Sequence, residues 1–278
     1  MEQCPIMMRV VKSQLSHSLG ALAVLAESGH GARLTDIATT LDVPKSSVQR
    51  LLQQLGEEGW VEQDAGTGHY RLTLRLAVLG QRYLQAIGIA DATEAILDAL
   101  ARKTRELIRL TVVDGERLVW IGSAQGAPPG LMYQPAMGGR IVSFATANGK
   151  AWLATLGPGA ADAVAARDGI AAATRPADVG PRAIRSLAAL RRDLSAVRDR
   201  GYAIADEEAE PGVAAVAVAV VDPDPVGARI FGTVSVAGPV VRMPRARYAA
   251  LARDLGETAR ELARVWPLKP AMATARTA

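Results

Sequence analysis

The sequence predicts an α+β protein of two domains, and three observations lead to this prediction. The chain has 278 residues and a mass of 29.2 kDa, which is long for a single domain. Apolar residues recur at helical spacing through the first part of the chain, up to Gly59. The later part mixes such helical stretches with short extended apolar runs that end in turns.

The composition indicates which classes of protein the chain can belong to. Hydrophobic residues make up 49% of the chain and charged residues 22%, which supports a packed core and leaves disorder to be expected only at the ends, over 1–13 and 267–278. The single cysteine, Cys4, can form no internal disulfide. The most apolar run, Val213 to Val221, is far shorter than a membrane span, and no segment has the pattern of a secretory signal. We therefore expect a soluble protein of the reducing cytoplasm that has no membrane partner.

The net charge of +4 and the pI of about 9.4 suggest a nucleic-acid partner, but the charge is not where such a partner would need it. Residues 1–88 contain eight Lys or Arg and eight Asp or Glu, so the whole excess lies in the rest of the chain. An argument for DNA binding must therefore rest on the arrangement of the side chains.

The first part of the chain predicts three helices. The first runs from Gln14 to Ser28, and the second starts at Leu34 and Thr35, where Thr35 is the expected N-cap. After a turn at Asp42 and Val43, Pro44 stands at or just before the start of the third helix, and Gly59 is its expected C-cap.

The third helix has an apolar stripe and an opposite face rich in hydrogen-bond donors. Such side chains can contact phosphates and base edges when the helix lies in a DNA major groove. The candidate residues are Lys45, Ser46, Ser47, Gln49, Arg50 and Gln53. Lys45, Gln49 and Arg50 are favoured because they lie on the first two turns, whereas the two serines could instead cap the helix and Gln53 could lie too far along it to reach a base.

An expected hairpin follows, with extended segments on either side of the glycine-containing turn 64–68. Three helices and a hairpin make a winged helix-turn-helix over 14–73, in which His69 and Arg71 are candidate phosphate contacts. His69 could equally be a solvated residue of the wing. A further helix from Leu74 to Ile89 is expected to link the domains, over 74–90.

The second domain, over 91–266, is expected to surround a mainly antiparallel sheet with helices. A helix over 91–106 precedes two strands, 109–113 and 117–121, joined at Asp114-Gly115. Later strands are expected over 213–221 and 231–236, with a turn at 222–225 between them, and helices over 183–200 and 245–265.

An extended segment ending at Phe144 leads into a helix that is expected to start at Lys150. The unpaired N–H groups over 145–150 could receive a carboxylate or another acceptor. A phosphate-binding loop is rejected because Phe144 replaces its first glycine and Ala151 its Ser or Thr.

No catalytic set, cofactor fingerprint or metal site can be identified in this domain, so none is assigned. Asp206, Glu207, Glu208 and Glu210 could hold a hard cation, but all three histidines lie in the first domain, and a solvated loop that helps to shape a pocket is favoured. A small-molecule sensor therefore fits better than an enzyme. Two alternatives stay open: an enzyme with an N-terminal interaction module, and a regulator without an effector.

Several motifs resemble those of the IclR family of bacterial transcriptional regulators, over roughly Ser16 to Val265. In the first domain these are LTDIATTLDVPKSSVQRLLQQLGEEGWVEQD and YRLTLRLAVLG. In the second they are GGRIVSFATANGKAWLA, GYAIADEEAEPGVAAVAVAV and GTVSVAGPVVR. The resemblance implies a GAF-like effector-binding domain for a small organic acid, and a dimer or dimer of dimers on a near-palindromic operator of double-stranded DNA.

Carried over to this sequence, the resemblance implies effector contacts from backbone, hydroxyl and apolar groups. They are Ala147 and Asn148 through the backbone, Ser235 through its side chain, and Tyr133, Ile141, Val213 and Ala215 as walls.

The chain also departs from the family pattern. Where the family often has Pro-Leu-His it has Val142, Ser143 and Phe144, and Ala237 stands where a second serine is common. Members that bind very small acids carry an acid near Ala205, a role that Asp206 could take here.

Tyr133 and Phe144 favour an effector larger and flatter than glyoxylate or pyruvate, and the resulting hypothesis is an aromatic acid or a close derivative. The alternative is that Phe144 is an ordinary core residue and Tyr133 a rim residue.

Overall fold

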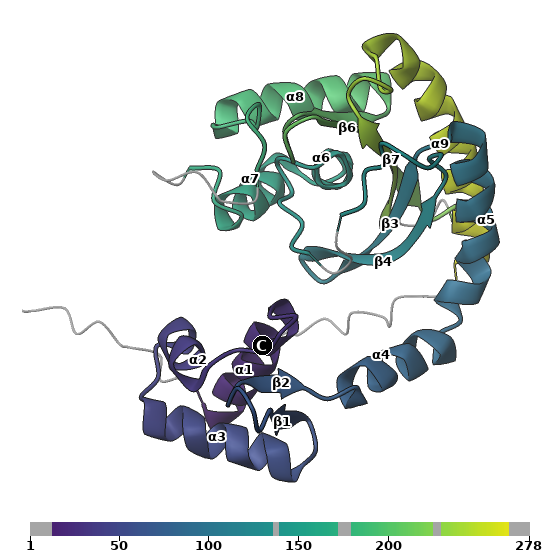
Figure 1. Ribbon diagram of the computed structural model, residues 1–278. Coiled ribbons are helices and arrows are strands. Elements are labelled where there is room, and N and C mark those ends of the chain that lie inside the picture. Colours follow the sequence, from purple (N-terminus) through teal and green to yellow (C-terminus); the bar gives the residue numbers. More distant parts are fainter. Residues whose placement is uncertain (1–12, 136–138, 172–178, 225–228, 267–278) are drawn as a thin grey trace, which may run out of the picture. The chain divides into compact units, whose positions relative to one another are not determined.

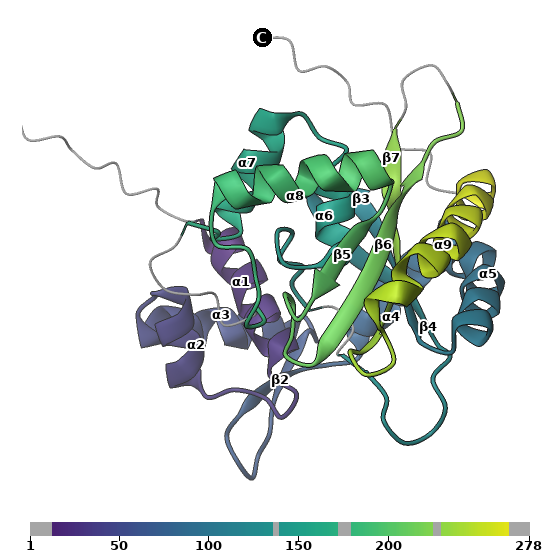
Figure 2. The same cartoon turned by 90° about the horizontal axis from the view of Figure 1, so that it is seen from above.

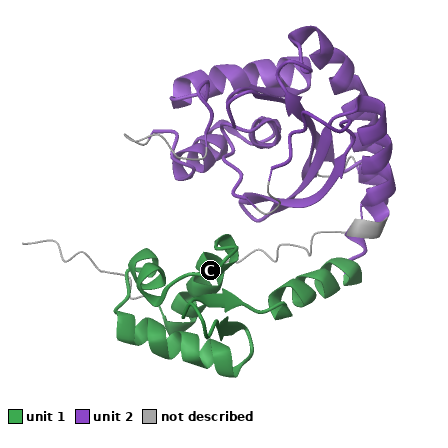
Figure 3. Cartoon of the chain, viewed as in Figure 1, with its two compact units in different colours: residues 1–86 green, residues 87–278 purple. Residues whose placement is uncertain are grey.

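The computed structural model describes residues 13–135, 139–171, 179–224 and 229–266 (Figure 1). The chain forms two compact units, residues 1–86 and 87–278 (Figure 3). The division falls within the stretch 74–90 that the sequence assigns to a linker helix. The ends for which disorder is predicted, 1–13 and 267–278, lie outside the described residues except for Ser13, whose side chain caps the first helix. Across the described part of the chain, every helix is too short or too polar to serve as a membrane span.

Unit 1 is a winged helix-turn-helix followed by one more helix, which confirms the predicted fold. Its elements are α1 (Gln14–Glu27), α2 (Leu34–Leu41), α3 (Lys45–Glu57), the antiparallel pair β1 (Val61–Gln63) and β2 (Tyr70–Leu72), and α4 (Arg75–Ala86). Its core is formed by apolar residues from all three N-terminal helices and the hairpin, among them Leu25, Ile37, Val48 and Leu52. The apolar stripe of α3 is therefore buried, and its polar face is left outward.

Two local predictions in unit 1 are wrong. The N-cap of α2 is Arg33, which has extended backbone and makes no side-chain cap, while Thr35 lies inside the helix and hydrogen-bonds Asp36. The helix predicted to reach Ile89 ends at Ala86, because Gly88 adopts a left-handed conformation with φ of 68° that separates it from the next helix.

Unit 2 is built on a five-stranded antiparallel sheet in the order β4-β3-β7-β6-β5. The strands are β3 (Leu107–Asp114), β4 (Arg117–Gln125), β5 (Ala203–Asp206), β6 (Val213–Val221) and β7 (Ile230–Pro239). The helices are α5 (Ile89–Thr104), α6 (Ala147–Leu153), α7 (Pro158–Arg167), α8 (Leu187–Arg200) and α9 (Arg245–Val265). Figures 1 and 2 show α5 and α9 side by side on one face of the sheet, and α6 and α8 on the other.

The side chains of β7 explain why the two faces differ. Thr233, Ser235 and Ala237 alternate with Val234 and Val236, and all five are buried. Asn148 of α6 donates a hydrogen bond to Thr233, so the hydroxyl-bearing set faces α6 and the valines face α5 and α9. The sheet therefore presents buried polar groups to α6.

Several boundaries in unit 2 differ from the predictions for local reasons. Helix α6 begins at Ala147, three residues before Lys150, because the hydroxyl of Thr146 accepts a hydrogen bond from the Gly149 N–H. Helix α8 begins at Leu187, because Ser186 caps it in the same way.

Two turns and one strand of unit 2 also bear on the sequence predictions. The hairpin turn after β3 consists of Gly115 and Glu116, with Asp114 still in the strand. Strand β5 lies in a stretch where the sequence predicted only a loop. The turn predicted at 222–225 ends at Pro225, which lies outside the described residues.

Candidate nucleic-acid interface and ligand cavity

The outward face of α3 carries the side chains that the sequence singled out. All of them are exposed: Lys45, Ser46, Ser47, Gln49, Arg50 and Gln53. Because Val48, Leu51 and Leu52 are buried in the unit 1 core, the helix cannot rotate to hide this face. The packing of α3 therefore fixes which of its side chains stay exposed.

These side chains are not equivalent. Ser47 and Arg50 line a hollow of about 230 Å³ together with Gln14 and His17 of α1, so they lie at the edge of the exposed face. Gln53 donates a hydrogen bond of 3.0 Å to Glu57 one turn later. No hydrogen bond or ion pair within the described residues engages the side chains of Lys45 and Gln49.

The two candidates on the wing already have neighbours. His69 accepts a hydrogen bond of 3.3 Å from Arg33 through its ring nitrogen, and Arg71 pairs with Glu62 at 2.8 Å across the hairpin. The Arg71 pair is about half exposed, so DNA phosphates could compete for the guanidinium at small cost.

The wing turn is organised by one carboxylate. Asp64 accepts hydrogen bonds from the N–H groups of Gly66 and Thr67 and from the Thr67 hydroxyl. These hydrogen bonds lower the pKa of Asp64 below its usual value. The turn between β1 and β2 is therefore ordered by its own sequence.

Unit 2 contains a small, partly open cavity between the sheet and the start of α6. Its volume is about 40 Å³, and its walls come from all five strands of the sheet, from the start of α6, and from the loops after β4 and β5. The lining residues are Arg109, Trp120, Tyr133, Thr146, Ala147, Asn148, Ala205, Ala209, Val213, Ala215, Ser235 and Ala237. Six of the predicted effector contacts meet here: Tyr133, Ala147, Asn148, Val213, Ala215 and Ser235.

Arg109 is the charged side chain of this wall. It lies on β3 directly opposite Ser235 of β7, and only 7% of its surface is exposed. Its guanidinium stacks on Trp120 with 3.4 Å between the guanidinium carbon and the ring centroid. Its Nε and Nη2 are buried without a hydrogen-bond partner in the described structure, and burial lowers the pKa of the group. An unpaired buried cation is thus part of the cavity.

Tyr133 closes the cavity on the loop side. Its hydroxyl donates a hydrogen bond of 2.6 Å to Glu210, in the loop between β5 and β6. Burial and this hydrogen bond raise the pKa of Tyr133, so the phenol stays protonated and remains the donor. The bond joins two loops that are far apart in the sequence.

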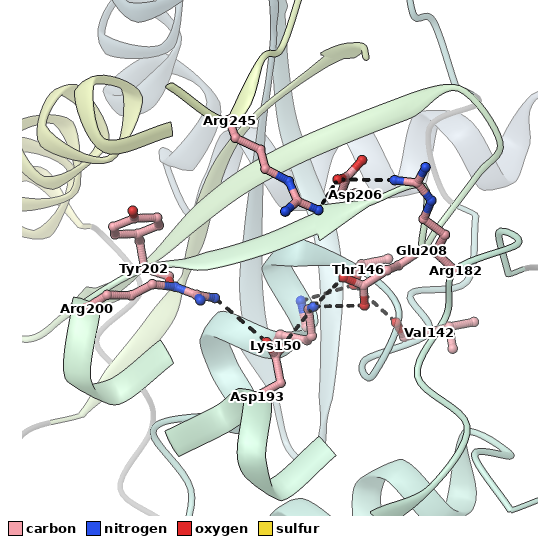
Figure 4. Close-up of polar contacts among 11 residues, drawn as sticks. Val142, Thr146, Lys150, Arg182, Asp193, Arg200, Tyr202, Asp206, Glu208 and Arg245 are labelled. Atoms are coloured by element: carbon pink, nitrogen blue, oxygen red, sulfur yellow. Dashed lines mark hydrogen bonds and ion pairs between the residues drawn. The ribbon is translucent and has the colours of Figure 1, made fainter. Parts of the chain in front are cut away.

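Three predicted effector residues do not line the cavity. Ile141 and Phe144 pack in a buried apolar cluster of unit 2, where Phe144 is 2% exposed, as in the alternative that made it an ordinary core residue. Asp206 points away, because Ala205 is its neighbour on β5 and successive side chains of a strand point to opposite faces. Asp206 instead pairs with Arg182 and Arg245, at 3.4 and 3.3 Å (Figure 4).

Each of the four acids after Tyr202 has a partner. Asp206 and Glu207 pair with Arg182, Glu208 pairs with Lys150, and Glu210 accepts from Tyr133. Within the described ranges, no group of three or more His, Cys, Asp or Glu side chains converges on a point where a metal ion could bind.

A larger groove of about 590 Å³ lies between β6 and α9. It is open to solvent, and none of its polar lining residues is buried. Because ligand sites combine enclosure with a few converging polar groups, the smaller cavity is the better candidate.

Sequence reasoning missed half of the lining residues. They are Arg109, Trp120, Thr146, Ala205, Ala209 and Ala237. The alternation along β3 could have indicated that Arg109 shares a face with Thr111, but not that this face is covered.

Comparison with known proteins identifies the family of both domains. The chain matches the model of the IclR helix-turn-helix domain over residues 14–65 and that of the bacterial transcriptional regulator IclR C-terminal domain over residues 81–264. The transcriptional regulator XynR of Escherichia coli is 31% identical over 213 residues, which cover 77% of this chain and 81% of XynR.

Two solved structures share the fold. An IclR transcriptional regulator from Alicyclobacillus acidocaldarius aligns with a TM-score of 0.76 at 24% identity, over 95% of this chain and 99% of that one. An IclR homologue from Microbacterium hydrocarbonoxydans, solved with 4-hydroxybenzoate, aligns with a TM-score of 0.70 at 21% identity, over 91% of this chain and 98% of that one. The two domain models together cover most of the sequence, and the chain belongs to the IclR family of bacterial transcriptional regulators, which are not enzymes.

Proposed function

We propose that this chain binds a near-palindromic operator through α3 and the wing of unit 1, and that a small organic acid in the cavity of unit 2 modulates this binding. The observation that carries the proposal is the small cavity of unit 2, in which a hydroxyl, the first turn of α6 and a buried cation converge among apolar walls. Such a site suits a ligand with one polar end. Action on chromosomal DNA accords with the cytoplasmic location expected from the sequence.

For DNA contacts, Lys45, Gln49 and Arg50 are proposed to meet base edges, and Ser46, Ser47 and Gln53 to support them. His69 and Arg71 are proposed to meet phosphates from the wing. The exposure of the α3 face supports the first set. The half-exposed Arg71–Glu62 pair, which phosphates could replace, supports the second.

Replacing Arg50 with alanine should reduce specific operator binding by about 1–3 kcal/mol, because a side chain that contacts a base or phosphate is lost. The measurement is a gel-shift titration on an operator selected in vitro with the wild-type protein. Arg102→Ala, an exposed arginine of unit 2, removes the same charge and is the control. Equal affinity of Arg50→Ala and wild type would remove Arg50 from the interface.

The size of the effector is a separate question. A cavity of about 40 Å³ holds only a few atoms, whereas a dry cavity of roughly 150 Å³ accepts a benzene ring. An aromatic acid therefore requires the cavity to widen. Two observations still favour an aromatic acid: the rings of Trp120 and Tyr133 in the wall, and the 4-hydroxybenzoate in the Microbacterium homologue.

A thermal-shift screen of acetate, pyruvate, glyoxylate, benzoate and 4-hydroxybenzoate tests the effector proposal. A ligand present at about 100 times its dissociation constant should add about 2.7 kcal/mol to the free energy of unfolding. An acid that shifts the melting temperature should then change operator affinity in the gel shift. A protein that responds to no acid would be a regulator without such an effector.

The homodimer that a near-palindromic operator requires, alone or as a dimer of dimers, is also part of the proposal. It is supported by apolar side chains of unit 1 that are exposed in the single chain. These are Leu15 and Leu19 on α1, Leu74, and Val78, Leu79 and Tyr83 on α4. Exposed apolar surface of this kind is typical of an interface between subunits.

A route for the signal is proposed through α4. Its first residue, Arg75, stacks on Trp60 at 4.6 Å from the ring centroid and donates to the carbonyl of Glu58, at the end of α3. Movement of α4 would therefore move α3 as well, and could change the spacing of two recognition helices in a dimer.

A further inference from the structure

We propose that Arg109 binds the carboxylate of the effector, and that this pairing makes the cavity selective for monoanionic acids over neutral molecules of the same shape. This inference rests on the proposed function, because it assumes that the cavity holds a small molecule. It adds the side chain that recognises the ligand and the selectivity that this side chain gives.

Arg109 is a charged side chain that is buried without a partner of opposite charge in the described part of the chain. A guanidinium keeps its charge at any ordinary pH, so burial cannot be relieved by deprotonation. The side chain is 93% buried, and two of its nitrogens lack a partner among the described residues. Buried charges in proteins are as a rule paired, since desolvation without a partner is costly. A missing anion is the simplest complement to this group.

The described residues around Arg109 supply no such anion. No carboxylate of the described residues lies within 4.0 Å of the Arg109 guanidinium, the range of an ion pair. The acid that acts on it at longer range is Glu210, and the Glu210 carboxylate already accepts the Tyr133 hydroxyl. Among the described residues no carboxylate pairs with Arg109, so a bound anion would supply the missing negative charge.

The geometry around Arg109 also suits a carboxylate. Trp120 covers one face of the guanidinium, so its edge, which carries the N–H donors, is the part available for hydrogen bonding. Ser235 lies opposite Arg109 on the neighbouring strand and also lines the cavity. A carboxylate between them would accept from both. The other walls are largely alanine and valine, which suit a short apolar or planar remainder and provide no second cation.

The test compares acids with their amides. Acetate and acetamide, pyruvate and pyruvamide, and benzoate and benzamide are matched pairs that differ in charge but hardly in shape. Each is titrated against wild type, Arg109→Gln, Arg109→Lys and Arg117→Gln, with melting temperature as the readout at constant ionic strength. Arg117 is the matched control, because it begins β4, is exposed and does not line the cavity.

At least one acid should stabilise the wild type and Arg117→Gln, while its amide should bind at least about tenfold more weakly. Arg109→Gln should lose the same factor for the acid and treat acid and amide alike, and Arg109→Lys should recover part of the preference. Without ligand, Arg109→Gln should melt at the same or a higher temperature than wild type, because an unpaired buried charge has been removed.

Each contrary outcome has its own meaning. If Arg109→Gln binds the acid as wild type does, or if wild type binds acid and amide equally, the role of Arg109 is overturned while the sensor proposal stands. If unliganded Arg109→Gln melts well below wild type, Arg109 is a structural residue and the inference is wrong. If no acid or amide stabilises wild type, the proposed effector function fails, and the inference fails with it.

Discussion

At the scale of single residues, Lys150 shows how a charge can hold a cavity wall in place. It is 1% exposed, and its ammonium lies 2.7 and 2.8 Å from the two carboxylate oxygens of Glu208 (Figure 4). The Oδ2 of Asp193 on α8 is 3.0 Å away, close enough for an ion pair but without hydrogen-bond geometry. Burial raises the pKa of Glu208, and Lys150 opposes that rise. The lysine therefore joins α6, α8 and the loop that carries the lining residue Ala209.

Lys150→Met should destabilise unit 2 by about 3–5 kcal/mol, because it leaves the largely buried carboxylate of Glu208 without its cation. The loss of stability should be smaller at acidic than at neutral pH. The folded-state pKa of Glu208 is already raised, and without Lys150 it rises further. A lower pH therefore protonates this carboxylate and removes its uncompensated charge. Urea unfolding at both pH values measures the effect. Lys103→Met breaks an exposed pair with Asp254 and should cost less than about 1 kcal/mol. Equal losses for the two variants would mean that burial of Lys150 does not matter.

At the scale of elements, the start of α6 is determined by close packing against the chain before it. The segment turns at 142–146 through hydrogen bonds from Ala145 and Thr146 to the Val142 carbonyl, and the Thr146 side chain then caps the helix. Gly149 lies against Ser143 so closely that a Cβ would be 2.3 Å from the Ser143 carbonyl oxygen. This approach positions the first turn of α6 on the cavity.

Gly149→Ala should therefore destabilise the protein by about 1–3 kcal/mol and weaken acid binding, because α6 must shift away from Ser143. Gly159→Ala on α7 is the matched control: no atom lies within 4 Å of its added methyl group, and an alanine within a helix should leave stability unchanged or raise it by up to about 1 kcal/mol. Thermal unfolding and the acid titration measure both effects. An unaltered acid response in a destabilised Gly149→Ala would separate α6 packing from ligand binding.

At the scale of the whole molecule, the proposed recognition of operator DNA would depend on assembly more than on overall charge. The net charge of +4 does not arise from residues 1–88, which balance to zero, so long-range attraction contributes little to placing unit 1 on DNA. Two copies on a two-fold symmetric operator would double the contacts of α3. The exposed apolar residues of α1 and α4 are the surface available for that pairing.

Leu19→Asp should weaken self-association by at least about tenfold, because it places an unpaired charge in the proposed subunit contact. The fold of the monomer should be unaffected, since Leu19 is 58% exposed. Sedimentation equilibrium measures the association constant, and the gel shift should show a matching loss of operator affinity. Thr40→Asp introduces the same charge at an exposed position of α2 and should leave the association constant unchanged. An unchanged constant for Leu19→Asp would place the interface elsewhere.

The sequence by itself determined the elements whose evidence is local. The period of Val48, Leu51 and Leu52 identified α3 and, with it, the face that remains exposed. The Asp-Gly pair indicated the β3–β4 hairpin, and the extended runs 213–221 and 231–236 indicated β6 and β7. Local energetics decide such features, so neighbouring residues are sufficient evidence for them.

Only the tertiary structure decided which side chains share the cavity. Arg109 and Ser235 are paired across strands that are more than a hundred residues apart, and nothing near Arg109 in the sequence indicates that it is buried. In the same way, one position along β5 separates Ala205, which lines the cavity, from Asp206, which pairs with two arginines outside it. Register across a sheet and coverage by distant helices set these outcomes, because both depend on long-range pairing that local sequence does not encode.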